Sequence, residues 1–123
     1  MSADAAPTGI EDHTRVHSTR VSRAVTDLLY SANHRDIDGL FDCFQSSGLV
    51  IQSGRHYVGL DAIRDWAVKT FIVDNASLSQ LWFATNGNSA AVRARMTSRH
   101  GTTTRTFVFD VEGTLIRTLR VIF

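Results

Sequence analysis

The stretch FVFDVEGTLIRTL at residues 107–119 decides the fold class. Two runs rich in aromatic and β-branched residues flank Glu112-Gly113, and a glycine in a short polar loop between such runs is typical of a β-hairpin. Similar breaks, NGN at residues 86–88 and HG at residues 100–101, lie upstream. The spacing predicts four strands, at residues 77–85, 89–99, 102–110 and 115–123. The second half of the chain is therefore predicted to be an antiparallel meander.

The first half of the chain has the periodicity of helices. Apolar residues three and four positions apart predict helices over residues 12–32, 36–44 and 61–71, with Phe44 as the last apolar residue of the second. Between the second and third helices, a short hairpin is predicted from residue 49 to residue 58. Helices followed by an antiparallel sheet indicate an α+β fold with the helices on one face of the sheet. We therefore expect three helices packed on a curved antiparallel sheet, forming a cone-shaped α+β barrel with a central pocket.

Length and composition limit the class of protein. The 123 residues are 43% hydrophobic and carry a formal net charge of +1, which fits one globular domain. Residues 1–11 are small and polar and predict a disordered leader, so the domain is expected over residues 12–123. A single cysteine, Cys43, excludes an internal disulfide, and no Cys/His cluster has zinc spacing.

The same composition sets expectations about partners and location. The chain has no apolar run near the length of about 20 residues that a membrane span needs, and no secretory signal is predicted. The near-neutral charge is unlike that of a dedicated nucleic-acid binder. We therefore expect no metal site, and a protein that binds neither nucleic acid nor a membrane.

Three motifs, in this order, resemble the nuclear transport factor 2-like superfamily: RDIDGL at residues 35–40, GLDAIRDW at residues 59–66, and the hairpin of residues 107–119. Within that superfamily the chain looks most similar to the SnoaL-like proteins and the ketosteroid isomerases, over residues 16–123. The resemblance implies a cytoplasmic protein that uses no cofactor, with a ligand pocket inside the cone and a homodimer formed through the outer face of the sheet. It also implies cofactor-free isomerase, cyclase, dehydratase or hydrolase chemistry, because this fold hosts all of these activities.

The acid–base groups of a ketosteroid isomerase are changed at the positions where the resemblance would put them. The general-base aspartate falls at Gln52, the phenol of the oxyanion hole at Leu28, and the two supporting tyrosines at Phe44 and Ala67. The second aspartate falls near Arg105. An amide cannot accept a proton at neutral pH, so steroid isomerisation is not predicted.

Residue chemistry nevertheless gives a set of candidate site residues. Alternation along the strand puts Arg105 on the same face as Phe107 and Phe109, where a buried unpaired charge would need an anionic partner. The candidate catalytic residues are His56 or Asp27 as the base, with Gln52 and Arg105 stabilising developing negative charge. The candidate ligand-binding residues, expected to line an apolar pocket, are Leu28, Tyr30, Phe44, Trp66, Phe107, Phe109, Leu119 and Phe123.

Each candidate also has a purely structural interpretation. The apolar set would equally form a filled core, and His56 would be a solvated hairpin residue. Asp27 would be a helix-surface acid, and Arg105 would pair with Asp27, Asp65 or solvent. Two functions therefore stay open: a protein that binds a small apolar cyclic compound, with or without acid–base turnover, and a non-catalytic ligand-binding or dimerisation module.

The arginines of one strand indicate a different surface. Arg93, Arg95 and Arg99 alternate with apolar residues, so they are expected on the outer face of the sheet. Guanidinium groups there suit a polar dimer contact or plain solvent.

Overall fold

The computed structural model describes the backbone of residues 9–123 and the side chains from residue 19 onward. Most of the predicted leader therefore lies outside the described residues, although the first helix begins at Gly9, three residues before the predicted start. The elements are α1 (Gly9–Asn33), α2 (Ile37–Phe41), β1 (Phe44–Gln52), β2 (Arg55–Val58), α3 (Gly59–Ala67), the π-helix η2 (Val68–Val73), β3 (Ser77–Asn86), β4 (Ser89–Ser98), β5 (Gly101–Glu112) and β6 (Leu115–Ile122).

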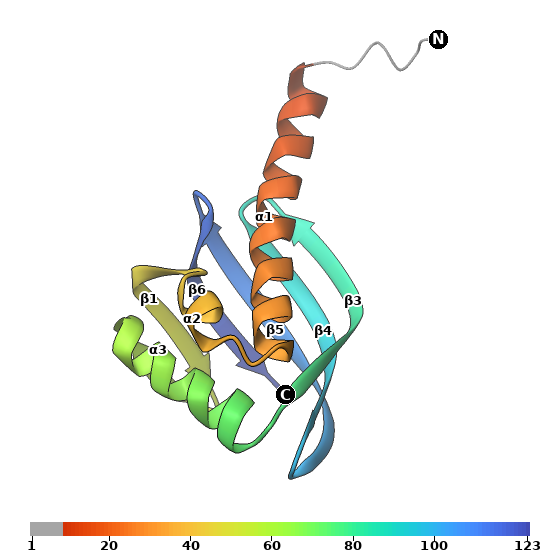
Figure 1. Cartoon of the computed structure of the whole chain (residues 1–123). Helices are drawn as coiled ribbons and strands as arrows, with labels where there is room; N and C mark the ends of the chain where they lie inside the picture. Colours follow the sequence, from red (N-terminus) through yellow and green to blue (C-terminus); the bar gives the residue numbers. More distant parts are fainter. Residues whose placement is uncertain (1–8) are drawn as a thin grey trace.

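The helices cover one face of a single six-stranded sheet, with strand order β2-β1-β6-β5-β4-β3 (Figure 1). The sheet curves around α1 without closing, so the predicted cone-shaped α+β fold is confirmed. One pairing differs from the expected antiparallel sheet, because β1 runs parallel to β6. Hairpin signals act between neighbours in sequence, so they predict only antiparallel pairs, whereas β1 meets β6 across the length of the domain.

The junction between α2 and β1 differs from the prediction. The helix ends at Phe41, and Phe44 starts β1, where it pairs with Ile116 on β6. Gly48 lies inside the strand at a register shift, and a Cβ there would come within 3.2 Å of the Cδ1 of Ile63. The helical spacing of Phe44 was thus a false signal, because sheet pairing outweighs weak local propensity.

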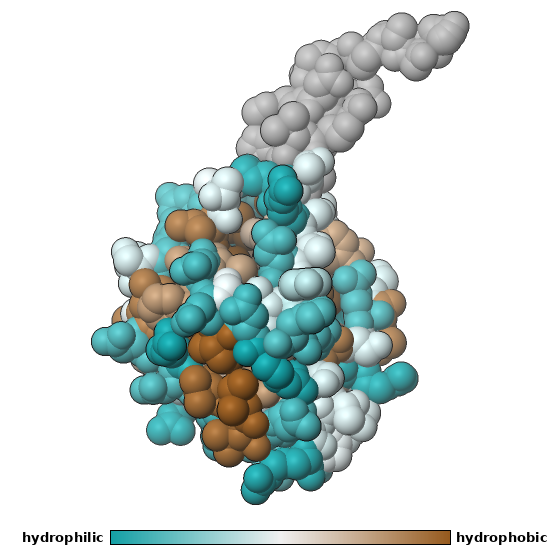
Figure 2. Space-filling view, in the orientation of Figure 1, coloured by the Kyte–Doolittle hydropathy of each residue, from teal (hydrophilic) through white to brown (hydrophobic). Residues whose placement is uncertain are grey.

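The third helix continues as a π-helix rather than ending at Phe71. In η2, Thr70 and Phe71 point inward and are buried, whereas Val68, Ile72 and Val73 are exposed. Figure 2 shows the resulting hydrophobic patch over the end of the α3–η2 segment. A π-helix inside an α-helical run is costly and is frequent at functional sites. Here it carries the buried Thr70 and ends at Asp74.

Arg35 ties the loop after η2 to the end of α1. This residue has a positive φ of 60°, and its guanidinium donates to the side chain of Asn75 at 2.9 Å and to that of Ser77 at 3.1 Å. It also donates to the carbonyl of Ala76. The segment that follows Asp74 is therefore fixed from a distant part of the chain.

The core fills the middle of the cone. The side chains of Leu28, Phe71, Phe107, Phe109 and Leu119 are at most 1% exposed. Full burial of such a side chain stabilises the fold by about 1.5–3 kcal/mol. None of the helices in the described part of the chain combines the length and hydrophobicity that crossing a bilayer requires.

Candidate functional site

A cavity of about 140 Å³ opens at the end of the cone where β1 ends and the β4–β5 turn lies. A cavity of about 150 Å³ is known to hold one benzene molecule, so this space fits a single ring. Its walls come from β1, η2 and the loop after it, β4 and β5. They are formed by Gln52, Thr70, Asp74, Ala76, Met96, Ser98, His100, Gly101, Thr103 and Arg105.

Arg105 is the cation of this cavity. It lies on β5 opposite Ala94, which is fully buried on the concave face. Its Nε donates to the Oγ1 of Thr103 at 3.2 Å, and its guanidinium carbon lies 3.8 Å from the centre of the Phe123 ring. Burial lowers the pKa of Arg105 from its ordinary value, because desolvation penalises the charged form.

One nitrogen of Arg105 lacks a partner. Its Nη1 is buried, and the described residues supply no hydrogen-bond acceptor for it. A buried donor left unpaired costs about 1–3 kcal/mol, and a charged one costs more. The guanidinium belongs to a residue that lines the cavity, so an anionic group brought there by a ligand would offset its unpaired charge.

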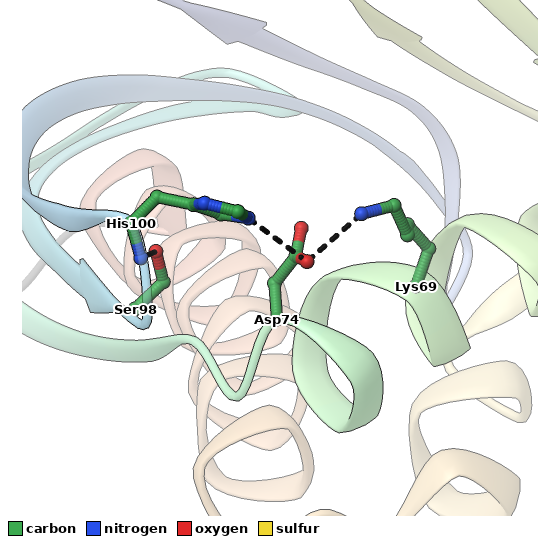
Figure 3. Close-up of polar contacts among 4 residues, drawn as sticks. All are labelled: Lys69, Asp74, Ser98 and His100. Carbon is green, nitrogen blue, oxygen red and sulfur yellow. Dashed lines mark hydrogen bonds and ion pairs between the residues drawn. The ribbon is translucent and has the colours of Figure 1, made fainter.

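Asp74 and His100 form a carboxylate–imidazole pair at the same cavity (Figure 3). The Oδ1 of Asp74 lies 3.2 Å from the Nε2 of His100 and accepts a hydrogen bond from the Nζ of Lys69 at 2.8 Å. The Lys69 hydrogen bond lowers the pKa of Asp74, burial opposes that shift, and His100 lowers the pKa further. Asp74 is therefore ionised at neutral pH and holds one ring nitrogen of His100.

Backbone hydrogen bonds fix the positions of this pair. The backbone N–H of Asp74 donates to the carbonyl of Lys69 at 2.9 Å, and the carbonyl of Asp74 accepts from the N–H of Arg99 at 3.0 Å. The Oγ of Ser98 accepts from the backbone N–H of His100 at 3.1 Å. The end of η2 and the β4–β5 turn are thereby joined. A neutral imidazole that donates through Nε2 has Nδ1 left as its proton acceptor.

Gln52 closes the cavity from β1. Its Oε1 accepts a hydrogen bond from the indole Nε1 of Trp66 at 2.6 Å. This contact orients the side-chain amide, so its NH₂ group is the part that can donate to a ligand. Trp66 is 2% exposed and makes an edge contact with Phe71, with 5.7 Å between ring centres. It therefore supports Gln52 from within the core.

The structure brings two of the four candidate catalytic residues together, Gln52 and Arg105, and Phe123 joins them through its contact with Arg105. Apart from Tyr30, the other expected apolar lining residues lie in the packed core, which is the filled-core interpretation of the sequence. None of them lines the cavity at Arg105, and each is at most 4% exposed: Leu28, Phe44, Trp66, Phe107, Phe109 and Leu119.

The two candidate bases lie elsewhere. His56 is exposed on β2 opposite Ile51, on the face away from the buried Val50. Asp27 and Tyr30 line a second, more open cavity of about 460 Å³ between α1, α2 and the β5–β6 turn. Neither base shares a cavity with Arg105.

Cys43 also lines this second cavity and has no sign of activation. Burial, followed by the charges of Asp27, Asp42 and Asp36, raises the pKa of the Cys43 thiol to about 11. The thiol is therefore protonated at neutral pH, in keeping with the predicted role of a small buried side chain.

Sequence reasoning missed the Asp74–His100 pair. Both residues occupy segments identified only as breaks, at Asp74-Asn75 and His100-Gly101. A polar side chain beside asparagine or glycine is ordinary turn chemistry, so neither residue stands out alone. Their proximity depends on η2 ending beside the β4–β5 turn, which is a tertiary contact without a local sequence signal.

Comparisons with known proteins identify the class of fold. No family model and no curated protein matches the chain. A putative polyketide cyclase from Sinorhizobium meliloti superposes with a TM-score of 0.77 at 24% identity, over 80% of this chain and 93% of that one. A protein with a ketosteroid isomerase-like fold from Catenulispora acidiphila, in complex with trimethylamine, superposes with a TM-score of 0.73 at 14% identity, over 81% of this chain and 84% of that one. TerC, co-crystallised with polyporic acid, superposes with a TM-score of 0.72 at 17% identity, over 85% of this chain and 91% of that one.

These structures define the class of fold. The chain has the nuclear transport factor 2-like fold, which it shares with polyketide cyclase-like, cystatin-like and ketosteroid isomerase-like proteins. The resemblance read from the sequence motifs is confirmed at that level.

Proposed function

We propose that this protein binds a small cyclic compound at the Arg105 cavity and transfers a proton on it without a cofactor, as an isomerase or cyclase does. The observation that carries the proposal is the meeting of a carboxylate–imidazole pair with a partly buried guanidinium that has no ion-pair partner among the described residues, at one ring-sized cavity. Paired acid–base groups beside an unpartnered cation in a concave site are typical of a catalytic centre. The fold likeness to a putative polyketide cyclase and a ketosteroid isomerase-like protein supports the same class of chemistry.

The proposed step is enolisation of a ring ketone. The Nδ1 of His100 removes a proton from the carbon beside the carbonyl, the electron pair of the broken C–H bond forms the new C=C bond, and the π pair of the carbonyl moves to the oxygen. The amide of Gln52 donates to that oxyanion, whose charge the imidazolium formed on His100 balances, while the ionised Asp74 stabilises the imidazolium. His100 then returns the proton to the same carbon or to a conjugated one, so atoms and charge balance.

The size of the cavity limits the substrate. Because about 140 Å³ accommodates one ring, the reacting ring occupies the cavity and any further ring of a larger compound extends into solvent. TerC is similar in fold and was crystallised with polyporic acid, and we propose that the present chain likewise takes an oxygenated cyclic compound.

Deuterium exchange tests the proposal directly. Cyclohexanone and 4-oxocyclohexanecarboxylate are incubated with the protein in D₂O, and loss of the α-proton signals is followed by NMR. We expect catalysed exchange that His100→Gln reduces about 100-fold or more, which is the usual contribution of a general base. His56→Gln, a matched change at an exposed histidine, should keep the wild-type rate. Equal rates for the His100→Gln variant and the wild type would refute the assignment.

We also propose that the chain forms a homodimer through the outer face of the sheet. Trp82 on β3 and Ile122 on β6 are 53% and 45% exposed there, with the exposed Arg93 opposite Trp82. An aromatic and an aliphatic side chain beside a guanidinium suit a contact between copies. Light scattering should give the mass of a dimer for the wild type and that of a monomer for Trp82→Glu. A monomeric wild type would contradict the proposal.

A further inference from the structure

We infer that the compound bound at this cavity carries a carboxylate, which the Arg105 guanidinium holds beneath the ring of Phe123. The inference rests on the proposed function, because it names the class of compound for the same site. The structure supports it through three independent features of Arg105: its hydrogen bonding, its charge balance and its stacking.

Among the described residues, hydrogen bonding satisfies only the Nε of Arg105. Its Nε is satisfied by the Oγ1 of Thr103, whereas the buried Nη1 finds no acceptor among the described residues. A carboxylate can accept from Nη2 with one oxygen and from the neighbouring Nη1 with the other, which is the end-on bidentate pairing of a guanidinium.

Charge balance leads to the same class of ligand. Within the part of the chain that the structure describes, no carboxylate forms an ion pair with Arg105. The single acidic side chain of the cavity wall, Asp74, is matched by Lys69 at 2.8 Å. The positive charge of Arg105 is thus not balanced by any described carboxylate, and a ligand with a single negative charge would balance it. A phosphate dianion would bring a second negative charge close to Asp74 without a second unpaired cation.

Phe123 selects for a planar ion pair. Its ring is stacked 3.8 Å from the guanidinium carbon and remains 70% exposed, so it covers one face of the cation. A guanidinium covered on its face binds an anion in its own plane, where carboxylate geometry matches the fork of N–H groups. We therefore expect the plane of the carboxylate to lie parallel to the Phe123 ring.

Isothermal titration with benzoate, benzamide, benzyl alcohol and phenyl phosphate tests the inference. These probes share one ring and differ in the group offered to Arg105. We expect benzoate to bind at least about 10-fold more tightly than benzamide, because hydrogen bonds to charged groups are the stronger ones. Benzamide binding as tightly as benzoate would overturn the carboxylate assignment, and so would phenyl phosphate binding more tightly.

Variants of Arg105 test whether this residue causes the preference for benzoate. Arg105→Gln should remove the benzoate preference and keep the fold, since Arg105 is only partly buried and makes one side-chain hydrogen bond. Arg105→Lys should recover part of the preference, because it keeps the charge but loses the planar fork. Arg23→Gln, a matched change at an exposed arginine of α1, should behave like the wild type. A preference that survives in Arg105→Gln would overturn the inference.

The outcome separates the two proposals. If neutral and anionic rings bind equally while proton exchange still depends on His100, the carboxylate inference fails and the proposed function stands. If benzoate binds through Arg105 but no ketone exchanges its protons, the chain is a carboxylate-binding protein and the proposed proton transfer fails. If no ring compound binds, both proposals are wrong.

Discussion

The middle and the open end of the cone are built from the same sheet face but do different work. In the middle, apolar side chains from helices and strands meet and exclude water completely, as at Phe107 and Leu119. At the end, the same face of β5 continues to Arg105, and loops supply Asp74 and His100 in place of helix side chains. The comparison teaches that in this chain the middle of the cone holds the apolar core, whereas the rim gathers the polar groups on which the proposed chemistry rests.

The largest expected effect is on the stability of the middle. Phe107→Ala removes a fully buried ring and should lower the free energy of unfolding by about 3–5 kcal/mol. Phe123→Ala, at the exposed end, should change it by less than about 0.5 kcal/mol. Urea unfolding followed by circular dichroism measures both values. Similar losses for the two variants would remove the distinction between core and rim.

A second prediction sharpens the role of Asp74 at the rim. Asp74→Asn keeps the size of the side chain but removes the charge that stabilises an imidazolium at His100, so proton exchange should fall about 10- to 100-fold. Benzoate affinity should change little, because Arg105 has no described contact with Asp74. Steady-state exchange rates, with benzoate titration as the control, separate the two. A loss of binding equal to the loss of rate would assign Asp74 a structural role.

Acid should weaken the contacts of Asp74 with Lys69 and His100 at the rim, whereas the packing of the apolar middle does not depend on pH. Because the Lys69 hydrogen bond lowers the pKa of Asp74 below its ordinary value of 3.8, the unfolded chain takes up this proton at a higher pH than the folded chain. The contribution of Asp74 to stability is thus present above about pH 4 and is lost as the pH falls through the lowered pKa. Unfolding measured from pH 6 to pH 2.5 should show the wild type losing its advantage over Asp74→Asn. Asp65→Asn, at an exposed acid on α3, is the control. Parallel curves for wild type and Asp74→Asn would contradict this expectation.

The smallest expected effect concerns the second cavity. With the pKa of its thiol raised to about 11, Cys43 should react slowly with iodoacetamide at pH 8, and its rate should rise until about pH 11. Removing one of the nearby charges by Asp27→Asn should lower that midpoint slightly, because burial is the larger cause. A rate that levels off near pH 8 would show an activated thiol and would make this cavity a rival site.

Local signals predicted the fold well and the site only in part. Turn residues such as Glu112-Gly113 and the periodicity of α1 act between sequence neighbours, so the meander and the helical cover were predictable. The parallel pairing of β1 with β6 and the start of β1 at Phe44 depend on residues that are about 70 positions apart, as the Phe44–Ile116 pair shows.

The same difference between local and long-range signals explains which residues of the candidate site could be predicted. Arg105 and Gln52 were accessible to prediction because strand alternation and family position both single them out. His100 and Asp74 were not, because each is an ordinary turn residue until η2 and the β4–β5 turn meet. The π-helix that produces this meeting has no recognisable pattern in the sequence VKTFIV at residues 68–73.

The most direct test of the account is to locate a bound ring by NMR, using benzoate and protein labelled at methyl groups. Methyl groups of Met96, Thr70 and Thr103 line the cavity at the rim, whereas those of Leu28 and Leu119 lie in the core. We predict nuclear Overhauser contacts from the benzoate ring to the rim methyl groups and none to the two leucines. Contacts to Leu28 and Leu119 instead would show that the middle of the cone opens to ligands, and would contradict the division between a stabilising middle and a chemical rim.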